Sequence, residues 1–247
     1  MAAQEKPMAG YSSRLLSRAE VAEGTMAFRF AKPSGFDFKA GQFAIWTLLD
    51  PPETDAEGNR RTFTIASAPF EDQLMFATRM RDTAFKRSLK SVALGTEIKL
   101  VGPMGSFTLH ANPARPAVLL AGGIGITPFF SIVKQASHDG VPQKLHLFYS
   151  NRRPEDAPFL DVLQELEKTN PNFYLIATMT DLARSQSRWE GETGFISKEM
   201  LTRHLGDLQK PIYYIAGPPA MVAAMQEMLV TSGIHEDNLR MEGFAGY

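Results

Sequence analysis

The chain has 247 residues, of which 44% are hydrophobic and 21% are charged, and its formal net charge is −1. This balance is typical of a globular protein with one large core or two modest ones, and it gives no overall attraction to nucleic acid or to an anionic membrane. The chain has no cysteine, which excludes disulfides, cysteine-ligated zinc and cysteine-ligated iron–sulfur clusters. Redox chemistry in this chain would therefore need an organic cofactor.

The first eleven residues carry charges and a proline and lack the apolar segment of a signal peptide. No later run of the sequence reaches the length of a membrane span. We therefore expect a cytoplasmic protein. The five histidines show no metal-ligand spacing, so no metal site is expected.

The first half of the chain contains short, aromatic-rich segments bounded by turn residues, which predict strands at 27–30, 43–48, 73–80 and 97–101. The polar stretch 50–59 predicts a long hairpin loop between two of them. One helix is predicted around 88–92, with Ser88 as a suitable N-cap. Many short strands at nearly regular spacing indicate a small antiparallel β-barrel.

After residue 112 the pattern changes to apolar strands, predicted at 118–120, 145–149, 173–178 and 212–216. Most of them alternate with helices, predicted at 128–137, 159–168, 198–205 and 219–232. This alternation indicates an open parallel α/β sheet with helices on both faces. The sequence therefore predicts two domains, a β-barrel over residues 1–112 and an α/β domain over residues 113–247.

Two turns in the second domain connect a buried strand to a helix. The first contains Gly122, Gly123, Gly125 and Pro128, and the second contains Gly217 and Pro218. A glycine-rich turn of this kind brings the amides of a helix N-terminus close to an anion, although a tight turn without a ligand has the same sequence. Because ligands of parallel sheets bind beyond the carboxyl ends of the strands, the two turns together predict a nucleotide site.

Four features occur in a fixed order along the chain: Arg61-Thr62-Phe63-Thr64, the segment 102–107, the first glycine turn and a terminal Tyr247. In this order they resemble the ferredoxin–NADP reductase superfamily, in which a flavin-binding barrel precedes a pyridine-nucleotide domain. The resemblance covers the chain from about Ser13 to Tyr247. It implies that Arg61 pairs with the flavin phosphate, that Phe63 lies near the flavin ring and that the Thr64 hydroxyl hydrogen-bonds near flavin N5. The planar fork of Arg61 suits a phosphate, although a surface arginine on a strand is the alternative.

The resemblance also implies a second flavin element, formed by the strand at 73–80 and the helix that follows. Its cofactor-binding residues would be Thr78, Arg79, Lys86, Arg87 and Ser88. Thr127 would lie where the two domains meet, within reach of both flavin and nicotinamide. The basic run that begins at Arg79 and includes Arg81 and Lys90 is either a solvated face or a docking surface for an acidic one-electron carrier.

The chain departs from the family pattern at the residues that would distinguish NADPH from NADH. Ser150, Arg152 and Arg153 are candidates to bind a 2′-phosphate, with a solvated loop as the alternative. Plant-type members have a Ser-Arg pair after the third strand, where this chain has Thr180-Asp181. An aspartate there would repel a phosphate, so NADH and NADPH both stay open, with NADH favoured. Another departure is Ala216, which replaces a cysteine that faces the nicotinamide in the family.

The carboxyl-terminal segment implies an aromatic cover for the flavin. A terminal tyrosine stacks on the flavin in the plant-type branch, so we favour Tyr247 over Phe244 for this role. Glu242, Gly243 and Phe244 are similar to the Glu-x-Phe ending of oxygenase reductases. The resemblance therefore assigns catalytic roles to Thr64, Glu242 and Tyr247, and Tyr247 also binds the cofactor.

Taken as a whole, the resemblance implies a flavin-dependent NAD(P)H oxidoreductase. It would move a hydride from the nicotinamide to bound FAD, with FMN as the less frequent flavin of the family, and pass electrons to a separate carrier such as a ferredoxin or an oxygenase component. Two alternatives stay open. One is a reductase of a small acceptor, such as a quinone, a ferric chelate or free flavin, and the other is a flavin-binding electron-transfer subunit that does not turn over.

Overall fold

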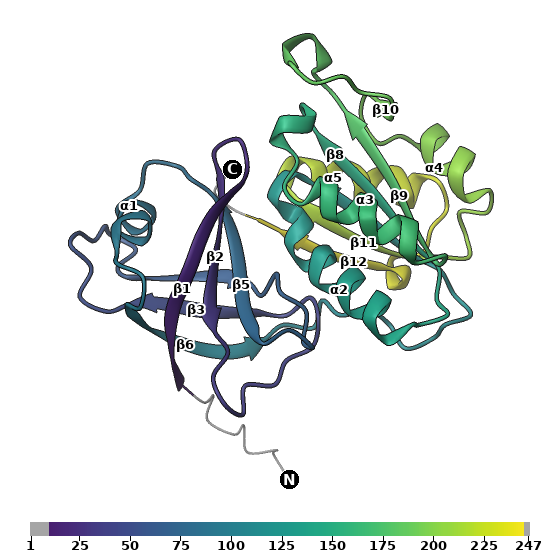
Figure 1. The fold of residues 1–247 in the computed structure, drawn as a ribbon. Helices are drawn as coiled ribbons and strands as arrows, with labels where there is room; N and C mark the ends of the chain where they lie inside the picture. Colours follow the sequence, from purple (N-terminus) through teal and green to yellow (C-terminus); the bar gives the residue numbers. More distant parts are fainter. Residues whose placement is uncertain (1–9, 245–247) are drawn as a thin grey trace.

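The computed structural model describes residues 10–244, which form a β-barrel and an α/β unit packed side by side (Figure 1). The barrel sheet is antiparallel, with the strand order β4-β3-β6-β1-β2-β5. Its strands are β1 (Gly10–Ala22), β2 (Thr25–Ala31), β3 (Phe43–Leu48), β4 (Arg60–Thr64), β5 (Gln73–Arg79) and β6 (Glu97–Met104). The strands at 27–30, 43–48, 73–80 and 97–101 are confirmed within a few residues, whereas β1 and β4 had not been predicted as strands.

Aromatic side chains fill the interior of the barrel. Phe28, Phe30, Trp46 and Phe76 are all almost completely buried there, and the Phe30 and Trp46 ring centroids lie 4.9 Å apart. The sheet curls until its two ends meet, where the Ala66 amide donates to the carbonyl oxygen of Met75 at 2.7 Å. The barrel prediction depended on the number of short, aromatic-rich strands and their nearly regular spacing, and the prediction is confirmed.

Helix α1 (Ala84–Ser91) begins four residues earlier than the sequence suggested. Its N-cap is Thr83, whose hydroxyl accepts a hydrogen bond from the Lys86 amide at 3.4 Å. The prediction of Ser88 as the N-cap is therefore wrong. Ser88 lies in the second turn of the helix, fully buried, and its hydroxyl donates to the carbonyl oxygen of Glu53 at 3.2 Å. Both residues offer a capping hydroxyl, and the burial of Ala84 on the barrel side favours the earlier start.

The second sheet is parallel throughout, with the order β10-β9-β8-β7-β11-β12. Its strands are β7 (Ala117–Gly122), β8 (Leu145–Asn151), β9 (Phe173–Met179), β10 (Glu192–Thr193), β11 (Ile212–Gly217) and β12 (Leu239–Gly243). The helices are α2 (Ile126–Asp139), α3 (Leu160–Thr169), α4 (Lys198–Leu205) and α5 (Pro219–Thr231), with short 3₁₀ turns at Gly123–Gly125, Pro154–Asp156, Leu182–Arg184 and Glu236–Asn238. The predicted α/β class is confirmed, while β10 and β12 had not been predicted.

Neighbouring residues of the central strand β7 face opposite layers of helices. Leu119 belongs to a core shared with Phe129 of α2 and Leu163 of α3. Leu120 belongs to a second core, shared with Leu201 of α4 and Leu229 of α5. This is why the strand is apolar throughout rather than alternating.

Helix α2 joins the two units. Its Ser131 hydroxyl donates to the carbonyl oxygen of Ser67 at 2.7 Å, and its Lys134 pairs with Glu71 at 2.6 Å. The barrel residues Met75 and Phe107 also belong to the same apolar core as α2. These contacts pack α2 against the segment that follows β4. The predicted boundary at residue 112 falls in the connection between β6 and β7.

Within residues 10–244, none of the helices combines the length and the apolar character that a membrane span requires.

Candidate functional site at the domain boundary

A cleft of about 940 Å³ lies where the two units meet. The carboxyl ends of β7, β8 and β9 and the turn between β11 and α5 form one side, and the β1–β2 turn and the end of β5 form the other. Seven of the predicted cofactor-binding residues line it: Arg79, Gly122, Gly123, Ser150, Arg152, Arg153 and Pro218. The fold thus gathers candidates from separate strands into one space.

The two glycine turns meet at the base of this cleft. A Cβ atom on Gly125 would overlap the carbonyl group of Ala216 in β11, and a Cβ atom on Gly122 would overlap the sulfur of Met221 in α5. A side chain at position 125 would push the turns apart, and a side chain at position 122 would displace the side chain of Met221. Glycine therefore permits the close backbone approach that a phosphate-binding turn needs, and the residues present fit a nucleotide.

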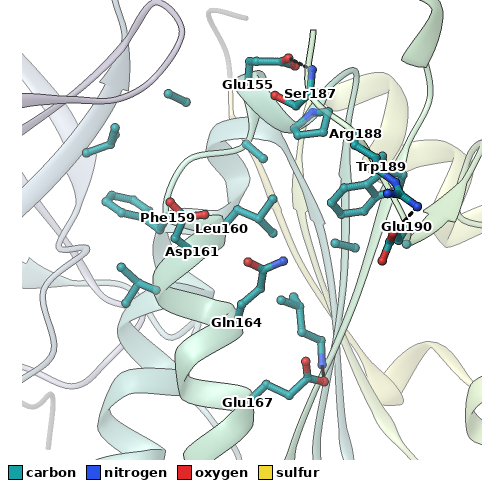
Figure 2. A pocket seen from close by; sticks show the side chains of 18 of the residues that line it. Glu155, Phe159, Leu160, Asp161, Gln164, Glu167, Ser187, Arg188, Trp189 and Glu190 are labelled. Carbon is teal, nitrogen blue, oxygen red and sulfur yellow. Dashed lines mark hydrogen bonds and ion pairs between the residues drawn. The ribbon is translucent and has the colours of Figure 1, made fainter. Parts of the chain in front are cut away.

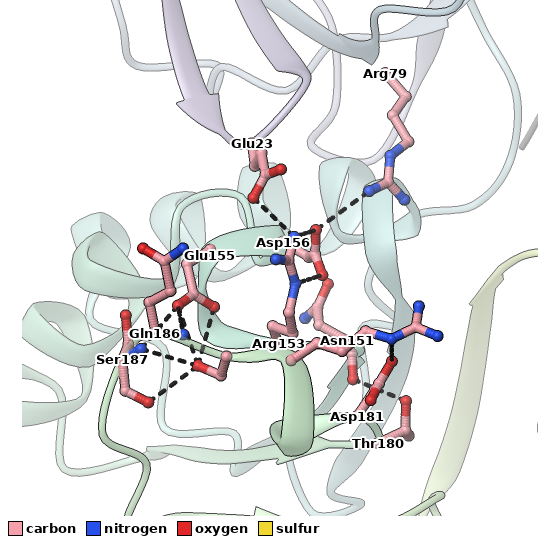
Figure 3. Close-up of polar contacts among 12 residues, drawn as sticks. Glu23, Arg79, Asn151, Arg153, Glu155, Asp156, Thr180, Asp181, Gln186 and Ser187 are labelled. Atoms are coloured by element: carbon pink, nitrogen blue, oxygen red, sulfur yellow. Dashed lines mark hydrogen bonds and ion pairs between the residues drawn. The ribbon is translucent and has the colours of Figure 1, made fainter.

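A buried carboxylate links the two units at the upper side of the cleft (Figure 3). Asp156 is only 8% exposed, and both of its oxygens accept from Arg153 at 2.9 Å. Arg79 of the barrel approaches the same carboxylate at 3.5 Å, and Glu23 of the β1–β2 turn pairs with Arg153 at 2.7 Å. The hydrogen bond from Arg153 holds the pKa of Asp156 below its usual value despite burial. Arg153 and Arg79 thus connect the two units across the cleft.

The far end of the cleft combines a carboxylate, a cation and an exposed ring. Asp181 follows β9 and pairs with Arg184 at 3.5 Å, and its amide donates to the carbonyl oxygen of Arg152 at 2.8 Å. Phe195, which also lines the cleft, is 80% exposed. Sequence reasoning did not single out Phe195, Asp156 or Glu23, because no motif marks them. Their roles depend on contacts between distant segments.

The buried end of β4 carries a polar group that lacks a partner. Thr64 is 4% exposed, and its hydroxyl oxygen makes no hydrogen bond to any part of residues 10–244. A buried hydroxyl normally has a partner, so this atom fits a hydrogen bond to a bound molecule such as a flavin ring. Thr127, the other predicted residue at the domain boundary, is buried in the first turn of α2, and its hydroxyl donates to the carbonyl oxygen of Ile124 at 3.1 Å.

The remaining predicted flavin residues lie around β4, β5 and α1, and most are held by neighbours. The Phe63 ring stacks on Phe76 with centroids 4.3 Å apart, and the Thr78 hydroxyl donates to the carbonyl oxygen of Arg79 at 3.4 Å. Lys86 donates to the same carbonyl at 2.6 Å, and burial is the main reason that the pKa of Lys86 is lowered. Arg61 and Arg87 form ion pairs with carboxylates of the loop between β3 and β4.

The last described strand brings a second partnerless group to the glycine turns. Glu242 lies opposite Ala216 in the pairing of β12 with β11, and its Oε2 is buried with no partner in the described part of the chain. Burial raises the pKa of Glu242 to about 7. The Phe244 amide donates to the carbonyl oxygen of Gly217 at 3.1 Å. Tyr247 lies outside the described residues, so the aromatic that covers the flavin stays a prediction.

A second cleft, of about 880 Å³, lies beside α3 and the loop that carries Trp189 (Figure 2). Asp161, Gln164 and Glu167 of α3 line one side of it. None of the binding residues predicted from the sequence lines this cleft. We therefore place the candidate site in the cleft between the domains.

Comparison with known proteins agrees with this geometry. Residues 119–227 match the family described as "Oxidoreductase NAD-binding domain". The reductase component of propane 2-monooxygenase from Mycolicibacterium goodii is 30% identical over 218 residues, which cover 86% of this chain and 61% of that protein. The chain spans about three fifths of the length of such curated relatives.

Solved structures share the arrangement over nearly the whole chain. The Amycolatopsis cytochrome P450 reductase GcoB superposes with a TM-score of 0.81 at 22% identity, covering 96% of this chain and 70% of that one. A ferredoxin NADP⁺ reductase from Neisseria gonorrhoeae, solved with bound FAD and NADP, gives a TM-score of 0.77 at 22% identity, covering 95% and 98%. The chain shares with both structures the same two-domain fold, a barrel followed by an α/β domain.

Proposed function

We propose that the chain is a flavin-dependent NAD(P)H oxidoreductase that binds FAD on the barrel and the reduced nucleotide in the cleft between the domains. The observation that carries the proposal is the convergence of both glycine turns and the end of barrel strand β5 on one cleft. FAD is preferred over FMN because the related Neisseria gonorrhoeae reductase was solved with FAD. When bound, the flavin would accept a hydride from the nicotinamide and release the two electrons one at a time.

The residues of the chain would bind, orient and shield the reacting groups. Thr64 would donate or accept a hydrogen bond at the flavin ring, and Thr127 would adjoin it from α2. The half-buried Glu242 would hold a proton near neutral pH beside the end of β11, because its pKa lies near 7. An aromatic at the carboxyl terminus, Tyr247 or Phe244, would cover the ring until the nicotinamide replaces it.

We propose NADH as the preferred donor. A 2′-phosphate would enter the end of the cleft that holds Asp181, where the carboxylate would repel it. The same carboxylate can accept hydrogen bonds from a ribose that lacks the phosphate. The exposed ring of Phe195 offers a surface on which the adenine can stack. Arg184, which pairs with Asp181, reduces the repulsion without removing it.

The electron acceptor would be a separate protein such as an oxygenase component, because the propane 2-monooxygenase relative is a reductase component. The structure supports no particular docking surface for it. Two of the cations in the basic run, Arg79 and Arg87, already pair with carboxylates. A cytoplasmic location stays a prediction of the sequence.

The test is an anaerobic titration of the flavin-loaded protein with NADH and, separately, NADPH, followed in the visible flavin band. Stoichiometric bleaching by NADH at lower concentration than by NADPH is the expected result. A flavin spectrum that neither nucleotide bleaches would leave only the binding-subunit alternative. A chain that takes up neither FAD nor FMN would contradict the proposal.

A further inference from the structure

The loop between β3 and β4, residues 50–59, is hereafter called the acidic loop, and it is folded against the cation that the flavin phosphate would need. Arg61 Nη2 donates to both carboxylate oxygens of Asp55, at 2.6 and 2.8 Å. Its Nε pairs with Glu57 at 3.1 Å, and its Nη1 donates to three backbone carbonyls of residues 57–60 at 2.8–3.2 Å. The acidic loop therefore satisfies every nitrogen of this guanidinium.

The same loop also contacts helix α1. Glu53 accepts from Arg87 through both oxygens, at 2.7 and 2.6 Å, while its own carbonyl accepts from the Ser88 hydroxyl. The Arg61 guanidinium lies 5.1 Å from the centre of the Phe85 ring, so the first turn of α1 is adjacent to the Arg61–Asp55 pair. The pKa of Asp55 is held below its usual value, first by the Arg61 hydrogen bond and also by backbone amides that include Phe85. Asp55 is thus an anion between an arginine fork and a helix N-terminus.

A flavin phosphate requires the same surroundings. Carboxylates and phosphates both accept bidentate hydrogen bonds from a guanidinium, and both are stabilised at a helix N-terminus. The unpartnered hydroxyl of Thr64 lies three residues along β4 from Arg61, and the proposed function assigns that hydroxyl to the flavin ring. We propose that the Asp55 carboxylate occupies the position of the flavin phosphate, and that the acidic loop must release Arg61 before a phosphorylated flavin binds. This inference rests on the proposed function and deepens it.

The exchange has a specific consequence for affinity. Binding of FMN or FAD breaks the Arg61–Asp55 pair. Part of the binding free energy that the phosphate contributes therefore offsets the loss of that pair. Riboflavin has no phosphate and leaves the pair in place. The acidic loop therefore lowers the affinity for phosphorylated flavins only, and it makes their retention sensitive to the charge of residue 55.

The first experiment titrates the full-length chain, stripped of flavin, with riboflavin, FMN and FAD, and compares wild type with Asp55→Asn. The expected result is about tenfold tighter binding of FMN and FAD by the variant, with riboflavin unchanged. Glu165→Gln, which removes an equal charge from an exposed pair with Lys168 on α3, serves as the matched control and should change nothing. Weaker FMN and FAD binding by Asp55→Asn would make Asp55 a positioning residue for Arg61 and overturn the proposal. An equal change for riboflavin, or no change, would overturn it too.

The second experiment follows the loop itself in the wild type by hydrogen exchange. The Glu57 amide donates to Asp55 Oδ1 at 3.0 Å, and the Gly58 amide donates to the Asp55 carbonyl at 2.9 Å. FMN should speed exchange at these two amides, whereas riboflavin should not. Unchanged exchange in the FMN complex would show that Asp55 stays in place, against the proposal. If wild type binds none of the three flavins, the proposed function fails, which is a different result from flavin binding without a loop effect.

Discussion

The two halves of the candidate site differ in the groups that they offer to an anion. On the α/β side, glycine turns present backbone groups at the ends of β7 and β11, and the space in front of them is a cleft of about 940 Å³. On the barrel side, Arg61, which we propose to bind the flavin phosphate, is held by Asp55 and Glu57 of the same chain. One half is a shaped backbone, and the other is a set of ion pairs between arginines and the acidic loop.

This difference suits the two molecules that we propose the chain binds, a nucleotide and a flavin. A nucleotide that arrives and leaves in every cycle gains from a site that needs no rearrangement, because each rearrangement lowers affinity and slows exchange. A flavin that stays bound can displace an internal carboxylate once and remain. The comparison therefore predicts that substitutions on the α/β side act through shape, and that substitutions on the barrel side act through charge.

The largest expected effect is that of Gly125→Ala. Its Cβ would overlap the carbonyl of Ala216, so the turn and β11 must move apart, which costs on the order of 2–4 kcal/mol of folding free energy. NADH affinity should fall sharply, while the folded fraction should still bind flavin. Thermal unfolding and nucleotide titration measure both. Gly10→Ala, at a glycine with open space around it, is the control. Unchanged NADH binding in Gly125→Ala would argue against a shape-dependent site.

Arg61→Ala tests the barrel side. The loss of a charge-assisted fork should weaken FMN and FAD by about 10–100-fold, with riboflavin affected far less. Arg188→Ala is the control, because Arg188 is an exposed arginine with a single ion pair to Glu190 beside the second cleft. Fluorescence titration of the flavin-free chain gives the three dissociation constants. A uniform loss for all three flavins would mean that Arg61 supports the barrel rather than a phosphate.

The glycine turns of the α/β side could be predicted from the sequence, because each lies between an apolar strand and a helix. Helix α4 was predicted with its observed bounds, 198–205, because its apolar residues recur at helical spacing between clear end signals. The short strands β10 and β12 were missed, as their pairing depends on neighbours in the sheet more than on their own residues. Helix α1 was placed too late because Thr83 and Ser88 both offer a capping hydroxyl.

The site residues divide in the same way. Gly122 was proposed from its place in a glycine turn and Arg61 from the family resemblance, and both stay predictions as binding residues. Asp156 was not proposed, because its role depends on Glu23, Arg79 and Arg153, which come from three separate segments. The ion pairs between Arg61 and the acidic loop could not be predicted either, because a polar loop with several acidic residues is typical of a solvated hairpin.

A smaller effect is expected from Asp181→Asn, which removes the charge at the far end of the cleft. At the separations and effective dielectric of a partly exposed site, one charge is worth on the order of 1 kcal/mol, so preference for NADPH over NADH should rise about 5–10-fold. Asp161→Asn, on α3 in the second cleft, is the matched control. The ratio of kcat/KM for the two nucleotides is the measurement. A ratio that moves equally in both variants would exclude a local role for Asp181.

The smallest effect compares two carboxylates whose pKa values are displaced in opposite directions. Burial raises the pKa of Glu242 from 4.5 to about 7, so the folded state keeps a proton that the unfolded chain releases in that window. Stability from Glu242 is therefore fully present below about pH 4.5 and is lost as pH rises to 7, by about 1 kcal/mol once screening by solvent at this partly exposed group is allowed for. The pKa of Asp55 is lowered instead, so its contribution is present above 3.8 and declines as pH falls below that value.

Chemical unfolding of the flavin-free chain at several pH values separates the two carboxylates. Glu242→Gln should gain stability relative to wild type between pH 4.5 and 7, because the amide has no proton to lose and no buried charge to form. Asp55→Asn should not change the free energy of unfolding between pH 4.5 and 7. It should reduce the loss of stability with falling pH only below the pKa of Asp55 in the unfolded chain. If the free energy of unfolding varies with pH in the same way for Glu242→Gln and wild type, water reaches the carboxylate in the folded state. Glu242 would then not be the group that holds a proton beside the nicotinamide.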